Sequence, residues 1–213
     1  MVDCRKTDFY DAKYSKGGFI YNEEKENAWL KTHLIDRFDM QAGNKLLEIG
    51  CGMGLHSSLL SSHGLSVWGV DISRVGIEAA KQRNSKAQFI AVSASDLSLY
   101  FDKEYFDVIF VRGMSWYHYE LDREMKLGVD PREETAKFFR FLKPGGLFIL
   151  QIKSDFSGNR PSSEVHHNRL SDYKKLFEPL GDIIHISNWQ GVDLISDEQA
   201  AGIKGGVLIA TRV

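Results

Sequence analysis

The stretch Leu46-Leu47-Glu48-Ile49-Gly50-Cys51-Gly52-Met53-Gly54 decides how this chain folds. An apolar run typical of a buried strand leads into three alternating glycines, and an amphipathic segment with helical spacing follows. Glycine lets the backbone turn sharply and approach a ligand, and the first amide groups of the following helix are free to donate hydrogen bonds. A turn without a ligand needs one or two glycines, so this loop predicts a site for a bound polar group.

A carboxylate stands at the end of the next apolar run. Val67-Trp68-Gly69-Val70 leads directly into Asp71. In a parallel sheet, a carboxylate at the tip of the neighbouring strand can accept hydrogen bonds from both hydroxyls of a ribose. The glycine loop and Asp71 together therefore predict a site for a ligand that contains a nucleoside.

Short apolar runs alternate with amphipathic segments from Lys45 to the C-terminus. This order predicts an α/β fold in which helices cover both faces of a parallel sheet, and the length of 213 residues suits a single domain over residues 1–213. Strands are expected at Lys45–Ile49, Ser66–Val70, Gln88–Val92, Asp107–Val111, Leu147–Lys153, Ile183–Ser187 and Val207–Arg212. Helices are expected at Asn22–Phe38, Leu55–His63, Val75–Arg83, Arg132–Leu142 and Ser171–Leu180.

The leader Asp8–Tyr21 is expected to be loose, yet it is rich in aromatic residues and contains the pair Gly17-Gly18. Two roles fit residues 1–21 equally well. They form a lid over a site, or they dock the terminus on the core, because burial of aromatic rings explains either.

The glycine loop and Asp71 resemble the class I S-adenosylmethionine-dependent methyltransferase family, over roughly Lys45 to Gly146. The resemblance implies a Rossmann-like, seven-stranded, mostly parallel sheet whose last strand is antiparallel, with S-adenosylmethionine as cofactor. In the family, the E/D-x-G-x-G-x-G turn lies under the methionine and ribose portions of the cofactor, and the second strand's carboxylate takes the ribose. The implied cofactor-binding residues there are Glu48, Gly50, Cys51, Gly52, Gly54, Asp71 and Ile72.

Two further segments are similar to parts of the same family. Phe106–Val111 resembles its fourth strand, and Leu142-Lys143-Pro144-Gly145-Gly146 resembles the turn before its fifth. At the third strand end the family often has an acidic residue followed by alanine, which contact the adenine amino edge, and this chain departs from that pattern. The adenine contacts then fall to Ser93, Ala94 and Ser95. Asp96 competes, either as a contact or as a cap of a short turn or helix that begins near Leu97.

A dinucleotide site is the competing interpretation, because it also uses a glycine-rich first turn and an acidic residue on the second strand. Binding of a pyrophosphate generally requires G-x-G-x-x-G, whereas here the glycines run G-x-G-x-G and position 55 is Leu. The carboxylate of Glu48 also disfavours a diphosphate, but it suits a ligand with an ammonium and a sulfonium group. The sequence therefore favours S-adenosylmethionine.

The segment Arg112–Glu120 follows the fourth strand, where the resemblance places the transferable methyl group. His118 has an intrinsic pKa of about 6.5 and is the predicted base, with a structural histidine as the alternative. Arg112 is expected to bind the cofactor carboxylate or an anionic substrate, or else to pair with an acidic side chain. The residues expected to shape an acceptor pocket are Tyr14, Trp116, Tyr117 and Tyr119.

Net charge and the missing sequence motif exclude some classes of methyl acceptor but do not identify the acceptor. The formal net charge of -2 gives no general positive field for nucleic acid, and no Asp/Asn-Pro-Pro-Tyr/Phe motif follows the fourth strand. The sequence therefore favours a small-molecule acceptor, with RNA or protein methylation, or cofactor binding without turnover, as alternatives.

Metal and membrane sites are not expected. The pair His166-His167 lacks familiar ligand spacing, so both histidines are expected to be structural or solvated. Two separated cysteines and the lack of a membrane-length apolar stretch favour the cytoplasm. Oligomeric state stays open.

Overall fold

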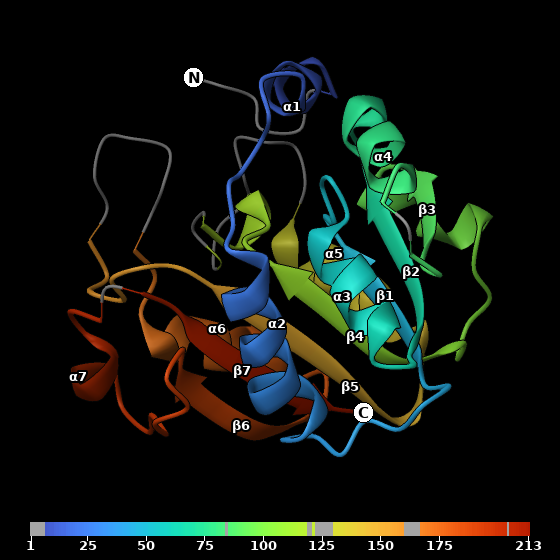
Figure 1. Cartoon of the computed structure of the whole chain (residues 1–213). Helices are drawn as coiled ribbons and strands as arrows, with labels where there is room; N and C mark the ends of the chain where they lie inside the picture. Colours follow the sequence, from blue (N-terminus) through green and yellow to red (C-terminus); the bar gives the residue numbers. More distant parts are fainter. Residues whose placement is uncertain (1–6, 84, 119–120, 122–129, 160–166, 204) are drawn as a thin grey trace. The chain divides into compact units, whose positions relative to one another are not determined.

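The computed structural model of the chain describes residues 7–83, 85–118, 121, 130–159, 167–203 and 205–213 (Figure 1). The described residues divide into two compact units, one up to residue 108 and the other from residue 109 onward. The expectation of a single domain stays a prediction. Within the described residues, no helix is both long and apolar enough to cross a membrane.

The first unit is built on three parallel strands, β1 (Lys45–Ile49), β2 (Ser66–Asp71) and β3 (Gln88–Ala91). The register pairs Lys45 with Ser66 and Asp71 with Ala91, so the three carboxyl ends lie along one edge. The crossover helices are α3 (Leu55–Ser62) and α4 (Arg74–Lys81), which bury Leu60 and Ile77 against the strands. Because ligands of such sheets bind beyond the carboxyl ends of the strands, this edge is where a site is expected.

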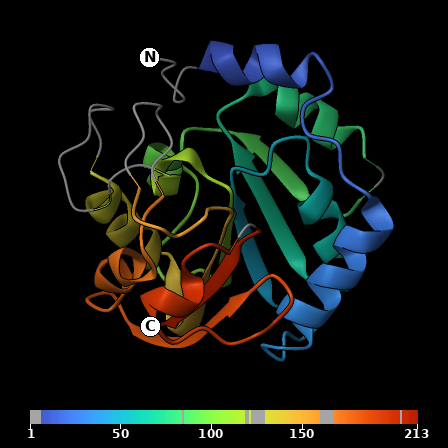
Figure 2. The same ribbon diagram turned by 90° about the vertical axis from the view of Figure 1, so that its left-hand side faces the viewer.

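The N-terminal region of the first unit is helical. It consists of α1 (Thr7–Tyr14), α2 (Glu23–Leu30) and a π-helical turn η1 (Lys31–Ile35). Both ribbon views place α1 beside α4, and α2 lies beside α3 (Figures 1 and 2). The η2 turn (Ala94–Leu99) follows β3, and β4 (Phe106–Arg112) starts at the end of this unit.

The second unit contains the other strands, β5 (Leu142–Ile152), β6 (Asp182–Asn188) and β7 (Val207–Arg212). β7 is antiparallel to both β5 and β6, so the predicted antiparallel last strand is confirmed. The strands of the chain belong to one seven-stranded sheet, in the order β3-β2-β1-β4-β5-β7-β6. The helical elements of this unit are η3 (Ser115–His118), α5 (Pro131–Phe139), α6 (Leu170–Phe177) and α7 (Asp197–Ala200).

Two local predictions were wrong. The segment Leu142–Gly146, expected to be a turn, is the start of β5, because Gly145 and Gly146 form backbone hydrogen bonds with Val213. The leader, expected to be loose, contains α1, because Asp11 and Tyr14 hold that segment against the rest of the first unit.

Candidate functional site

The glycine loop connects β1 to α3 with backbone conformations that other residues rarely adopt. Gly50, Gly52 and Gly54 have φ values of +80°, +53° and +74°. The amides of Gly50 and Cys51 both donate to the carbonyl of Val70, at 2.8 and 3.0 Å, which fixes the loop on the end of β2. The loop is therefore held in the position from which its remaining groups can meet a ligand.

The glycines of the loop have different neighbours. A Cβ atom at Gly54 would lie 2.6 Å from Cβ of Ala80 and 2.8 Å from the Phe89 ring, so this glycine is required by packing. A Cβ atom at Gly50 would meet nothing within 4 Å. The loop is thus packed at Gly54 and open at Gly50, which leaves room for a ligand against the backbone.

Asp71 connects β2 to the loop and to the next helix. Its carboxylate is 7% exposed and accepts hydrogen bonds from the amides of Gly52 and Ser73, both at 2.8 Å. Burial raises the pKa of Asp71, and the two amide donors partly oppose that rise. Since each carboxylate oxygen has two lone pairs, Asp71 can still accept hydrogen bonds from a diol.

Glu48 is buried beneath the loop, at 1% exposure, and faces the first turns of α3. Its carboxylate accepts a hydrogen bond from the Ser57 hydroxyl, and its Oε1 lies 3.6 Å from Nδ1 of His56. The other ring nitrogen of His56 lies 3.2 Å from the Glu26 carboxylate on α2. Glu48 therefore holds the loop through α3, while its predicted contact with the cofactor stays a prediction.

Two side chains of α1 reach the same region. The Asp11 carboxylate accepts from the Ser73 hydroxyl at 2.5 Å and from the Val75 amide at 3.2 Å, at the N-terminus of α4. The Tyr14 ring packs so closely on Gly52 that a Cβ there would lie 2.8 Å from the phenol oxygen. Burial and then the nearby Asp71 raise the pKa of Tyr14, so its hydroxyl stays protonated. The expected role of Tyr14 in acceptor binding stays a prediction.

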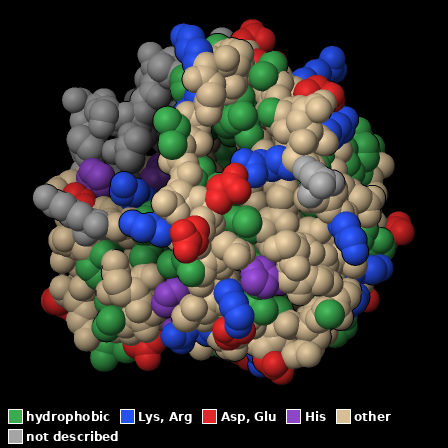
Figure 3. All heavy atoms as spheres, in the orientation of Figure 1, with side chains coloured by type: hydrophobic (Ala, Val, Ile, Leu, Met, Phe, Trp, Pro, Cys, Tyr) green, Lys and Arg blue, Asp and Glu red, His purple; other side chains and the backbone are tan. Residues whose placement is uncertain are grey.

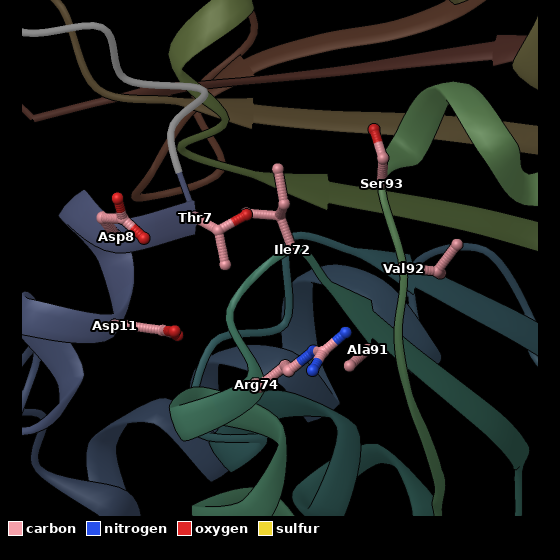
Figure 4. Close-up of a pocket in the computed structure, with 8 residues that line it drawn as sticks. All are labelled: Thr7, Asp8, Asp11, Ile72, Arg74, Ala91, Val92 and Ser93. Carbon is pink, nitrogen blue, oxygen red and sulfur yellow. The ribbon is translucent and has the colours of Figure 1, made fainter.

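A pocket of about 480 Å³ opens at the carboxyl ends of β2 and β3 (Figure 4). Figure 4 shows the α1 residues on one side, the segment after β3 on the other, and Ile72 and Arg74 between them. Its size falls within the range of roughly 300–1,000 Å³ that is usual for small-ligand sites. The lining residues are Thr7, Asp8, Asp11, Ile72, Arg74, Ala91, Val92 and Ser93.

Ser93, which follows the end of β3, lines this pocket and also caps the next turn. Ser93 is the N-cap of η2, and its hydroxyl accepts a hydrogen bond from the Ser95 amide at 3.3 Å. The turn begins at Ala94, so the idea that Asp96 caps a turn near Leu97 was wrong. Among the three predicted adenine contacts, Ser93 lines the pocket, whereas Ala94 and Ser95 are absent from its lining.

The predicted acceptor residues belong to the second unit, apart from Tyr14. Trp116 is 5% exposed and stacks on Phe138, with 5.9 Å between the ring centroids. Tyr117 is fully buried, with its hydroxyl 3.0 Å from that of Thr135. The described contacts of both side chains are thus with the core, and their substrate contacts stay predictions. Tyr119 lies outside the described residues.

Arg112 is the last residue of β4, and His118 is the last residue of the η3 turn that comes after it. The Arg112 guanidinium lies 5.8 Å from the centroid of the Trp189 ring. The Nδ1 atom of His118 is buried and has no hydrogen-bond partner within the described part of the chain. Burial, and then the neighbouring His167, lower the pKa of His118 to about 4. His118 is therefore neutral at pH 7 and can accept a proton, but only weakly.

Sequence reasoning predicted Ile72 and Ser93 as site residues but missed the other residues that line the pocket. Asp11 and Arg74 border it beside Ile72, and no local motif marked them. Helical spacing could have placed Asp11 on a helix, but the contacts that bring that helix to the sheet edge are long-range.

The structure also describes the surroundings of His167 and Cys51. His167, expected to be structural or solvated, lies 3.2 Å from Asp155 and 3.3 Å from the Ser154 hydroxyl, after the end of β5. His166 lies outside the described residues. Cys51 is buried, and burial raises the pKa of its thiol well above the usual range, so it is no nucleophile at pH 7.

Comparison with known proteins identifies the family. The family model described as "Methyltransferase domain" matches residues 47–150. The chain is 27% identical over 179 residues to the "Probable thiol methyltransferase 2" of Arabidopsis thaliana, covering 82% of this chain and 71% of that protein. It is 33% identical over 134 residues to the "S-adenosyl-L-methionine-dependent Diels-Alderase iccD" of Talaromyces variabilis, covering 60% of this chain and 40% of that protein.

A solved structure shares the fold. It is phosphoethanolamine N-methyltransferase 2 of Haemonchus contortus in complex with S-adenosyl-L-methionine, with a TM-score of 0.67 and 18% identity. The match covers 97% of this chain and 57% of that one. The chain thus spans little more than half of that enzyme and less than half of the Diels-Alderase.

Proposed function

We propose that this chain, which belongs to the class I S-adenosylmethionine-dependent methyltransferase family, passes the methyl group of that cofactor to a small-molecule acceptor. The observation that carries the proposal is the open backbone at Gly50 beside the buried carboxylate of Asp71. Gly50, Gly52 and Asp71 would hold the aminoacyl and ribose parts, and the cofactor supplies an electrophilic methyl on sulfur. The chain's own task is then to align the acceptor and exclude water.

His118 is proposed to take a proton from the acceptor. It is neutral at pH 7, but a base with a pKa of about 4 is too weak to deprotonate an alcohol efficiently. A thiol ionises near pH 8.5 and needs little help, so a small thiol or hydrosulfide is the acceptor class that fits best. The relative named as a thiol methyltransferase supports the same choice.

Turnover tests this proposal directly. The full chain is incubated with methyl-labelled S-adenosylmethionine and, in parallel, with hydrosulfide, thiophenol, phosphoethanolamine and a catechol. We expect S-adenosylhomocysteine to be released faster with a thiol than without an acceptor. His118→Gln is expected to lower kcat by about tenfold or less, because thiols ionise readily. Cofactor binding without release above background with any of these probes would contradict the small-molecule transfer.

A second function keeps the cofactor but transfers no methyl group. The relative named as a Diels-Alderase, at 33% identity, favours this candidate. It predicts tight binding of S-adenosylmethionine that persists through incubation with all four acceptors, with no S-adenosylhomocysteine formed. RNA methylation has less support, since Figure 3 shows acidic and basic side chains interspersed over the described part of one face, with no continuous basic stripe there.

A further inference from the structure

The proposed cofactor site departs from the family pattern at the end of the third strand. In the family pattern an acidic residue at the end of the third strand contacts the adenine amino group, and this chain has Ser93 there. The Ser93 hydroxyl already accepts a hydrogen bond from the Ser95 amide. A neutral hydroxyl in a capping role is a poor substitute for a carboxylate as acceptor for an amino group.

A carboxylate lines the same pocket on the side opposite Ser93. Asp8, in the first turn of α1, lines the pocket together with Ser93 and Ile72 (Figure 4). The Asp11 carboxylate of the same helix is engaged by the Ser73 hydroxyl and the Val75 amide. The Asp8 side chain, in contrast, has no hydrogen bond or ion pair to another residue within the described part of the chain, so its carboxylate is available to a ligand.

The pocket also contains a hydrogen-bond donor. Arg74, the first residue of α4, lines it between the two walls and has no ion pair among the described residues. Adenine carries both kinds of group on its edge, an amino group that donates and ring nitrogens that accept. The Asp8 carboxylate can accept from the amino group, and the Arg74 guanidinium can donate to a ring nitrogen. Both groups lie around Ile72, which directly follows the proposed ribose ligand Asp71.

We propose that Asp8 accepts a hydrogen bond from the adenine amino group and so replaces the acidic residue that the chain lacks at position 93. This inference rests on the proposed cofactor site and adds a determinant of base specificity from the N-terminal helix. Arg74 donates to a ring nitrogen in the same arrangement. Because the contact comes from α1, recognition of the base depends on that helix as well as on the sheet edge.

The test compares two ligands by calorimetry on the full chain. One is S-adenosylhomocysteine, and the other is its analogue in which hydrogen replaces the 6-amino group of the purine. We expect Asp8→Ala to weaken binding of S-adenosylhomocysteine about three- to tenfold while leaving the deamino analogue within about twofold, because the hydrogen bond to a charged but exposed group is lost. Asp8→Asn should fall between the wild type and Asp8→Ala, since an amide oxygen still accepts.

Two further variants separate this contact from other effects. Glu24→Ala removes an exposed carboxylate of α2 that is not in the pocket lining, and it should leave both affinities unchanged. Asp11→Ala should weaken binding of both ligands and also lower the preference for the amino group, because it loosens α1, the helix that carries Asp8. The assignment of Asp8 is overturned if Asp8→Ala keeps the wild-type preference for the amino group, or if Glu24→Ala abolishes that preference. If the wild-type chain takes up neither ligand, the proposed cofactor site itself is wrong.

Discussion

Gly50 and Gly54 share a left-handed backbone but occupy opposite environments. Gly54 faces the packed side chains of Ala80 and Phe89, whereas a Cβ at Gly50 would enter open space. Gly54 is therefore required by packing, whereas Gly50 is a residue of the proposed cofactor site. Both follow from the same local motif, which is why the sequence alone predicted the loop, but only the structure separates the two roles.

Gly54→Ala is expected to destabilise the fold by about 2–4 kcal/mol, because the new methyl group overlaps Ala80 and the backbone conformation is strained. Urea unfolding measures the change. Gly17→Ala is the matched control, since Gly17 also has positive φ, at +94°, but a Cβ there would have no atom within 4 Å. Equal losses for the two variants would show that packing at Gly54 contributes nothing.

Gly50→Ala is expected to lose at least about tenfold in affinity for S-adenosylhomocysteine, because its Cβ projects into the space assigned to the ligand. Its stability should fall only by the strain of the left-handed backbone, about 1–3 kcal/mol. Calorimetry and urea unfolding on the same preparation separate the two effects. Wild-type affinity in this variant would place the ligand elsewhere.

His118 predicts a pH dependence of stability. Its pKa is lowered in the folded chain to about 4, whereas an unfolded histidine titrates near 6.5, so the unfolded chain binds the proton more tightly. The contribution of His118 to stability is therefore complete above about pH 6.5 and is lost as the pH falls toward 4. Its upper limit is about 3 kcal/mol.

Unfolding of the wild-type chain and of His118→Gln between about pH 7 and pH 4 measures this contribution. The free energy of unfolding of the wild type should fall more steeply with acid than that of the variant. Parallel curves for the two proteins would mean that His118 is protonated equally in the folded and unfolded chains.

At the level of elements, the strands were the most predictable part of the fold. β1 and β7 match their expected bounds, and the other strands differ mainly at their ends. Apolar alternation and runs of β-branched residues are local signals, so they can be read from sequence. α1 could not be predicted in the same way, because it is held by contacts such as that between Asp11 and Ser73, which are 62 positions apart.

Asp11→Ala is expected to release α1 from the N-terminus of α4, because two hydrogen bonds to a carboxylate are removed. Hydrogen exchange of the α1 amides should speed up about tenfold or more, with little change in the strands. Ser15→Ala is the control, since the Ser15 hydroxyl donates to the Ala12 carbonyl within the leader itself. Unchanged exchange in Asp11→Ala would contradict the proposed anchoring of α1.

At the scale of the whole molecule, the family and the cofactor were accessible from sequence, but the acceptor was not. The groups that we propose to hold the cofactor lie in one short loop and one strand end, where residue spacing alone predicts them. The predicted acceptor residues other than Tyr14 lie in the other unit, and Trp116 and Tyr117 pack in its core. Which side chains meet an acceptor depends on tertiary packing, and residue spacing carries little information about that.

The central claim is that the loop from Glu48 to Gly54 and the Asp71 carboxylate hold an adenosyl sulfonium or its demethylated product. Calorimetric titration of the full chain with S-adenosylhomocysteine, and separately with a nicotinamide dinucleotide, tests it most directly. We predict saturable uptake of S-adenosylhomocysteine that Asp71→Ala weakens at least about tenfold, and no uptake of the dinucleotide. If the folded protein binds the dinucleotide and does not bind S-adenosylhomocysteine, the result would contradict this claim.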